Sequence, residues 1–190
     1  MIQTEEILVL PEGNFSTSVL KFEEKDRSVL FDIYKAWRKL SADLIDMSAR
    51  AINLPEGLSE GAFCLEMGFV RVTNSISGAN TSWDCYDLIN KERIQVKACS
   101  VLPDLTSFGP KSQWDKIYFL DFYRKGKWDG TFDIYLIDNE DIYNQKVNQN
   151  QSLKQQQEQG KRPRFSIFSS IIQSKDLSPV KTAYLNKSHY

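Results

Sequence analysis

The sequence has a single histidine, and this scarcity excludes several catalytic chemistries. His189 lies one residue from the C-terminus, where chains are usually poorly ordered. Ser-His-Asp triads, HExxH zinc sites and histidine-dependent nuclease motifs all need an ordered histidine inside the fold. The three cysteines, Cys64, Cys85 and Cys99, show no CxxC spacing, which argues against a disulfide framework or a zinc ribbon. We therefore expect reduced thiols in an intracellular, cytoplasmic protein.

Nucleotide-binding loops and membrane-spanning segments are also missing. Neither GxxxxGK(S/T) nor GxGxxG occurs, although the chain has nine glycines, and this argues against a nucleotide cofactor. The longest apolar runs, such as Ile7–Leu10 and Ile117–Leu120, are as short as strands and cannot cross a bilayer. No basic segment followed by an apolar one opens the sequence. We expect neither a membrane partner nor a secretion signal.

The composition is that of a globular protein with an uneven charge distribution. A chain of 190 residues, 41% hydrophobic and 26% charged, suits one domain. Residues 142–190 carry eight Lys and Arg against two acidic residues, a net charge of +6, whereas the rest of the chain carries −7. Such asymmetry suits an anionic ligand on one surface, and a solvated basic tail is the alternative. We predict a single domain over residues 1–190, with a core over about 27–140 and a basic, Asn- and Gln-rich C-terminal segment over about 142–190.

Hydrophobic periodicity indicates helices first and strands afterwards. Apolar residues recur every three or four positions over Arg27–Arg50, which predicts a long amphipathic helix. Ser59 as an N-cap predicts a second helix over 60–67, and residues 1–22 contain two short apolar runs whose structure the pattern does not determine. Strands are predicted over 69–73, 83–89, 93–100, 116–123, 132–137 and 165–172, with a polar helix around Leu153. This order predicts an α+β fold with a central mixed β-sheet flanked by helices.

Three polar side chains of the predicted hairpin point to one place. Asp84 lies near the start of the first hairpin strand, and Gln95 and Lys97 share one face of the second because side chains alternate along a strand. We expect the three to converge at the open end of the hairpin. A carboxylate, a neutral oxygen and an amine on a rigid sheet suit a Mg²⁺-dependent phosphodiesterase, in which the lysine orients or deprotonates a water. An ordinary cross-strand ion pair between Asp84 and Lys97 is the alternative.

The same residues resemble a known motif. Trp83-Asp84, ten further residues and Gln95-Val96-Lys97 are similar to the PD-(D/E)XK signature that many type II restriction endonucleases carry. Trp83 stands where the motif has proline. Gln95 stands where it has an acid, which removes one negative charge from the metal site. The resemblance implies a restriction-endonuclease-like core in which Asp84 and Gln95 hold Mg²⁺ and Lys97 manages the attacking water.

The resemblance also implies a carboxylate from the helix that precedes the hairpin. In this family such a carboxylate often completes the metal site. Glu60, in the first turn of the helix predicted after Ser59, is the candidate, and Glu66 on the same helix is the alternative. The implied catalytic set is Asp84, Gln95, Lys97 and Glu60, with Mg²⁺ as cofactor.

Candidate DNA contacts lie in two loops. Arg162 and Arg164 flank Pro163, which stiffens the loop, and Lys111 lies in the loop after the second hairpin strand. Arg and Lys are the side chains that read guanine in the major groove, and they also bind phosphates. The segments Asp104–Pro110 and Arg162–Phe165 resemble one group of small restriction enzymes that cut an interrupted GC-rich site.

The expected function is that of a type II restriction endonuclease, which hydrolyses double-stranded DNA at a short specific sequence with Mg²⁺. A palindromic site matches two-fold protein symmetry, so we expect a homodimer, for which the predicted helix over Arg27–Arg50 offers one surface. Two alternatives stay open. A DNA repair or junction-resolving nuclease would share the site but read DNA shape, and a non-catalytic DNA-binding module would carry Gln95 as the mark of a decayed site.

Overall fold

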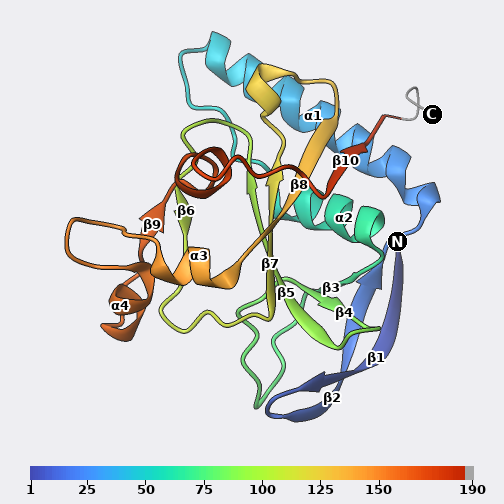
Figure 1. Cartoon of the computed structure of the whole chain (residues 1–190). Coiled ribbons are helices and arrows are strands. Elements are labelled where there is room, and N and C mark those ends of the chain that lie inside the picture. Colours follow the sequence, from blue (N-terminus) through green and yellow to red (C-terminus); the bar gives the residue numbers. More distant parts are fainter. Residues whose placement is uncertain (187–190) are drawn as a thin grey trace.

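An eight-stranded mixed sheet runs through the centre of the molecule (Figure 1). The structure is a computed structural model that describes residues 1–186, so His189 lies outside the described residues. The strand order is β1-β2-β3-β4-β5-β7-β8-β10, and of the pairings in this sheet only β5 with β7 is parallel. The strands are β1 Ile2–Leu10, β2 Gly13–Lys21, β3 Val70–Val72, β4 Cys85–Asp87, β5 Glu92–Cys99, β7 Lys116–Asp121, β8 Thr131–Ile137 and β10 Lys181–Tyr184.

Helices and a small second sheet cover the central sheet. Strands β6 (Thr106–Ser107) and β9 (Arg164–Phe165) form an antiparallel pair. The helices are η1 Glu24–Asp26, α1 Arg27–Asp46, α2 Glu56–Met67, η2 Arg124–Gly126, α3 Asn139–Asn144, α4 Leu153–Glu158 and the π-helix η3 Phe168–Gln173. No helix within residues 1–186 is long and apolar enough to cross a membrane.

Each face of the sheet builds its own apolar core. On one face, Leu30 of α1 and Phe63 of α2 pack with Val96 of β5. On the other, Phe119 of β7 packs with Phe165 of β9. The alternation of side chains along each strand sends successive residues into different cores. The predicted α+β architecture, with a central mixed sheet flanked by helices, is confirmed.

The N-terminal hairpin, which the sequence left undetermined, extends the sheet at one edge. Strands β1 and β2 pair without interruption from Ile2 with Lys21 to Leu10 with Gly13. The hydroxyl of Tyr86, in β4, accepts a hydrogen bond from the Val9 amide at 3.1 Å and donates one to the Val9 carbonyl at 2.8 Å. The hairpin is therefore tied to the strand that follows Asp84.

Two predicted elements are corrected by the structure. Ser59 is not an N-cap: α2 begins at Glu56, directly after Pro55, and the Ser59 hydroxyl lies inside the helix, where it donates to the Glu56 carbonyl at 3.1 Å. Proline fits this position because the first turn of a helix does not need its N–H. The strand over 165–172 is wrong beyond Phe165, because residues 168–173 form η3.

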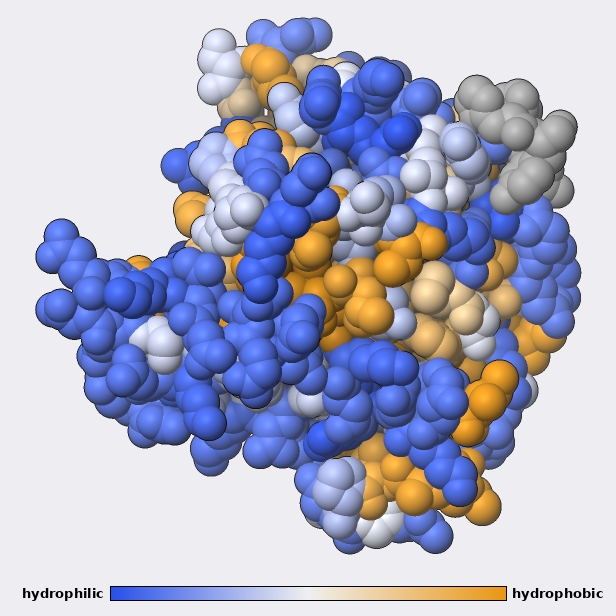
Figure 2. All heavy atoms as spheres, in the orientation of Figure 1, coloured by the Kyte–Doolittle hydropathy of each residue, from blue (hydrophilic) through white to orange (hydrophobic). Residues whose placement is uncertain are grey.

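The predicted polar helix is confirmed in a hydrophilic lobe. Helix α4 starts with a capping box in which Ser152 accepts from the Gln155 amide and Gln155 accepts from the Ser152 amide. Leu153 is fully buried and anchors the helix on the rest of the molecule. Figure 2 shows that the lobe around α3, α4 and β9, at the left, is almost wholly hydrophilic on this face. Ile142 of α3 and Phe165 of β9 are buried as well, so a few apolar side chains hold a largely hydrophilic segment in place.

Candidate active site and nucleic-acid interface

Asp84 and Gln95 meet across the two strands of the β4–β5 hairpin. The register pairs Cys85 with Ile94, so Asp84 stands opposite Gln95, and the Asp84 amide donates to the Ile94 carbonyl at 3.0 Å. The Gln95 side-chain amide donates to Asp84 Oδ2, and the Val96 backbone amide donates to the same oxygen at 2.8 Å. Only 2% of Gln95 is exposed. The carboxylate therefore lies at a fixed place at the entry to β4.

Lys97 follows on the same face of β5. Its Nζ lies 5.8 Å from the centre of the Phe108 ring, and within residues 1–186 it forms no ion pair with a carboxylate. Burial raises the pKa of Asp84, and the Lys97 charge and the Val96 amide act against this rise. Lys97 is thus close enough to act on Asp84 without being neutralised by a salt bridge.

Glu60 approaches this pair from α2. Its carboxylate forms an ion pair with Arg71 of β3. Burial, followed by the negative charge of Asp84, raises the pKa of Glu60 to about 7, and Arg71 opposes the rise. Both carboxyl groups are therefore held where their ionised forms are disfavoured. Such a pair is typical of sites that bind a cation or move a proton.

Glu66, the alternative to Glu60, serves a different purpose. Its carboxylate lies 2.5 Å from the guanidinium of Arg27 and 2.7 Å from the ammonium of Lys181, and its side chain is only 3% exposed. Two cations from α1 and β10 thus face Glu66, and Arg27 also pairs with Glu24 at 2.8 Å. Glu66 joins distant parts of the chain and is not brought to Asp84.

Glu56 is a residue of this site that the sequence analysis missed. It lies one turn before Glu60 on α2, and its charge raises the pKa of both Asp84 and Glu60. Residues four apart share one face of a helix, so Pro55 as the helix start would have placed Glu56 beside Glu60. The expected start at Ser59 left it outside the helix.

The donor set fits a divalent cation held by few protein ligands. Asp84 and Glu60 supply carboxylates, and Gln95 would supply its oxygen if its amide, which now donates to Asp84, were turned over. No group of three His, Cys, Asp or Glu side chains within residues 1–186 forms a metal cluster. Mg²⁺ tolerates such a set because it retains several of its waters and often binds one or two carboxylates. A cation there would also relieve the cost of two buried acids.

The candidate DNA contacts gather around the loop after β5. The β6–β9 pair sets Ser107 opposite Arg164, and the Phe108 amide donates to the Pro163 carbonyl at 3.1 Å. Phe108 is also the residue beneath Lys97. Arg162 and Lys111 belong to the same two segments, and a Cβ on Gly109 would lie 3.9 Å from the Arg162 guanidinium. The structure thus places the basic candidates on the Lys97 side of the sheet.

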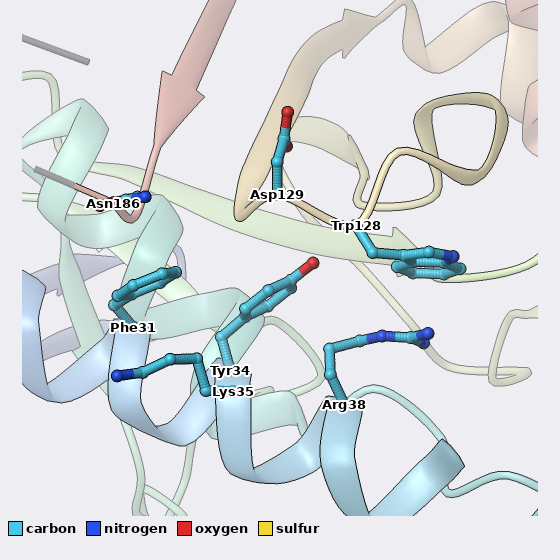
Figure 3. A pocket seen from close by; sticks show the side chains of 7 residues that line it. All are labelled: Phe31, Tyr34, Lys35, Arg38, Trp128, Asp129 and Asn186. Atoms are coloured by element: carbon cyan, nitrogen blue, oxygen red, sulfur yellow. The ribbon is translucent and has the colours of Figure 1, made fainter. Parts of the chain in front are cut away.

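The surface has two hollows that bear on the position of the site. One, of about 350 Å³, lies between α1, the turn before β8 and the end of β10 (Figure 3), and is lined by Phe31, Tyr34, Lys35, Arg38, Trp128, Asp129 and Asn186. The Arg38 guanidinium lies over Trp128 at 3.6 Å there, and no predicted site residue lines it. The other, of about 380 Å³, lies between the Lys111 loop, α3 and α4. Only the second contains a predicted DNA contact.

Comparison with known proteins identifies the family of this chain. The family model described as Bsp6I restriction endonuclease matches residues 22–174, which include every predicted site residue. The type II restriction enzyme Bsp6I of Bacillus sp. (strain RFL6) is 36% identical over 165 residues, which cover 84% of this chain and 90% of that enzyme. No solved structure matches the chain. The predicted resemblance to restriction endonucleases is confirmed, and the chain belongs to the Bsp6I restriction endonuclease family.

Proposed function

We propose that this protein is a type II restriction endonuclease that hydrolyses double-stranded DNA at a short specific sequence with Mg²⁺. The family match supports the class of activity. The observation that carries the proposal is the meeting of Asp84, Gln95 and Lys97 on one face of the β4–β5 hairpin, with Glu60 beside Asp84. The segment from α2 through β5 to the parallel strand β7 is accordingly assigned to a PD-(D/E)XK, restriction-endonuclease-like core.

Each side chain has a separate task in this proposal. Asp84 and Glu60 hold the cation, and Gln95 contributes a neutral oxygen. When bound, Mg²⁺ supplies charge neutralisation at the scissile phosphate and lowers the pKa of a water. Lys97 orients the attacking water or accepts its proton, and its ammonium balances the charge that develops on the phosphate. Phe108 supports Lys97 from below.

Lys111, Arg162 and Arg164 are proposed as DNA contacts. All three lie in the segments that surround β6 and β9, on the same side of the sheet as Lys97. Phosphate contacts from such residues fix the register of a protein on the duplex. The basic segment over about 142–190 would extend this surface, and the hollow beside Lys111 gives it a concave part.

A homodimer through α1 is proposed for the reading of a two-fold site. Val29, Ile33 and Leu40 are 44%, 41% and 48% exposed and lie on one stripe of α1. An antiparallel pairing of two copies centred between Ala36 and Trp37 would bring Ile33 of one copy against Leu40 of the other. The same pairing brings Lys39 of one copy near Asp32 of the other, beside the ion pairs that Lys39 forms with Asp43 and Asp32 with Lys35 within each helix. Sedimentation should show a dimer at micromolar concentration, and Leu40→Asp should give a monomer.

Digestion of a sequenced plasmid tests the proposed function. With Mg²⁺ we expect discrete, reproducible fragments whose mapped ends share one short sequence, and with EDTA no cutting. Cutting confined to branched DNA would instead assign the chain to the junction-resolving nucleases. A plasmid bound but uncut by the wild type, Asp84→Ala and Lys97→Ala alike would indicate a non-catalytic module.

A further inference from the structure

The loop that leads into Asp84 is joined to the loop that carries Lys111. Asn80 Nδ2 donates to the Lys111 carbonyl at 2.9 Å. The Asn80 side-chain oxygen accepts from the Ser82 amide at 3.0 Å and from the Ser82 hydroxyl at 2.6 Å. The Ser82 hydroxyl in turn accepts from the Gln113 amide at 2.9 Å. Hydrogen bonds therefore hold this loop at Lys111 and at Gln113, two residues later.

Asn80 is itself held from two further directions. The Asn80 backbone amide donates to the Glu12 side chain at 3.0 Å, at the turn of the N-terminal hairpin. The Asn80 backbone carbonyl accepts from the indole N–H of Trp83 at 2.6 Å. Trp83 is 4% exposed and directly precedes Asp84. Trp83, which stands where the PD-(D/E)XK motif has proline, thus holds Asn80 close to Asp84.

We propose that Asn80 is a positioning residue for DNA cleavage. It fixes the Lys111 loop relative to β4, so that a DNA phosphate held by Lys111 lies at a set position with respect to Asp84. The inference rests on the proposed function, because it uses Lys111 as a DNA contact and Asp84 as a metal ligand. It adds a residue that touches neither DNA nor metal but sets the geometry between them. Small displacements of this kind reduce the rate of the chemical step.

Two substitutions distinguish the hydrogen bond from Asn80 to the Lys111 carbonyl from the turn that Asn80 forms with Ser82. Asn80→Ser keeps an oxygen for the Ser82 amide but is too short to reach the Lys111 carbonyl, whereas Asn80→Ala removes both. Both changes are neutral in charge, so electrostatic attraction to DNA is unchanged. We expect each to lower the single-turnover rate at saturating DNA by about tenfold, the cost of one or two hydrogen bonds. Gln3→Ser, which removes an exposed amide that donates to Ser18 at 2.7 Å, is the matched control and should cleave like the wild type.

A double-mutant cycle with Lys111→Ala decides the proposal. The substrate is a duplex taken from a plasmid fragment that the wild type cuts. If Asn80 acts through the Lys111 loop, Asn80→Ser adds less than about twofold to the loss caused by Lys111→Ala. A double variant whose loss of cleavage rate equals the product of the two single losses would overturn the inference. Unimpaired cleavage by Lys111→Ala would overturn it as well. Failure of the proposed function is seen separately, as full cleavage by Asp84→Ala.

Discussion

The two ends of α2 carry glutamates that differ in the charges around them. Glu66, near the C-terminal end, is 3% exposed and faces two cations, Arg27 and Lys181. Glu60 is 12% exposed and has one cation, Arg71, against the negative charges of Asp84 and Glu56. Burial is similar at both ends of the helix. The balance of charge is not.

This difference separates a structural site from a candidate functional one. A buried carboxylate whose charge is compensated holds elements of the chain together and would lose much if a partner were removed. A buried carboxylate with an excess of negative charge nearby lowers the stability of the free protein and is relieved when a cation binds. The Glu60 end of α2 thus has the electrostatics of a binding site, and the Glu66 end those of a clamp.

The largest expected effect comes from removal of a catalytic group at the Glu60 end. Lys97→Ala and Asp84→Asn should each slow single-turnover cleavage by about 10³-fold or more, because each removes a group that acts in the transition state. Glu66→Gln should slow cleavage by less than about tenfold where the protein is folded. Lys97→Ala should still bind the duplex. Cleavage by Lys97→Ala within tenfold of the wild type would contradict the assignment.

Stability should respond in the opposite order. Glu66→Gln removes the carboxylate that pairs with Lys181 and one of the two carboxylates on Arg27, which keeps its ion pair with Glu24. The loss should therefore stay below the roughly 3–5 kcal/mol that a buried ion pair loses with one whole partner. Glu60→Gln removes an unfavourable charge and should leave the free energy of unfolding at pH 8 unchanged or higher. Urea denaturation of both variants in EDTA measures the contrast. A Glu60→Gln protein less stable than Glu66→Gln would show that the two ends had been interpreted the wrong way round.

The sequence could predict the parts of the site that depend on local periodicity. The alternation of side chains and the short turn were enough to place Asp84 opposite Gln95, and hydrophobic spacing was enough to predict α1. The choice between Glu60 and Glu66 was different. That choice depends on Lys181, which is 115 residues from Glu66, and on Arg71, which lies in β3, the strand that pairs with β4. Spacing along one helix contains no information about such partners.

The failed strand prediction beyond Phe165 has the same cause. Asp104, a buried residue about sixty positions earlier, accepts from the Ile167 amide at 2.9 Å and from the Phe168 amide at 3.2 Å. Those two N–H groups would have joined a ladder in a strand, but the carboxylate satisfies them and a helical turn follows. Alternating apolar residues near Phe165 favour a strand only when no distant acceptor competes for the backbone.

The smallest expected effect is a pH dependence of stability that resides at the Glu60 end alone. The pKa of Glu60 is about 7 in the folded protein, above its ordinary value of 4.5, so the folded state binds the proton more tightly than the unfolded state. This contribution to stability is full below about pH 4.5 and is lost as pH rises towards 7 and above. In EDTA, the free energy of unfolding should fall by about 2–3 kcal/mol between pH 5 and pH 8 more in the wild type than in Glu60→Gln.

Glu66→Gln is the control for this prediction, because it keeps Glu60 and its neighbours and should keep the wild-type slope. Saturating Mg²⁺ should flatten the wild-type curve above pH 7, since a cation stabilises the ionised form of Glu60 and replaces the lost proton. Urea unfolding at half-unit pH steps measures both slopes. If wild type and Glu60→Gln gave parallel curves, the raised pKa would belong to another group, and the electrostatic contrast between the two ends of α2 would be wrong.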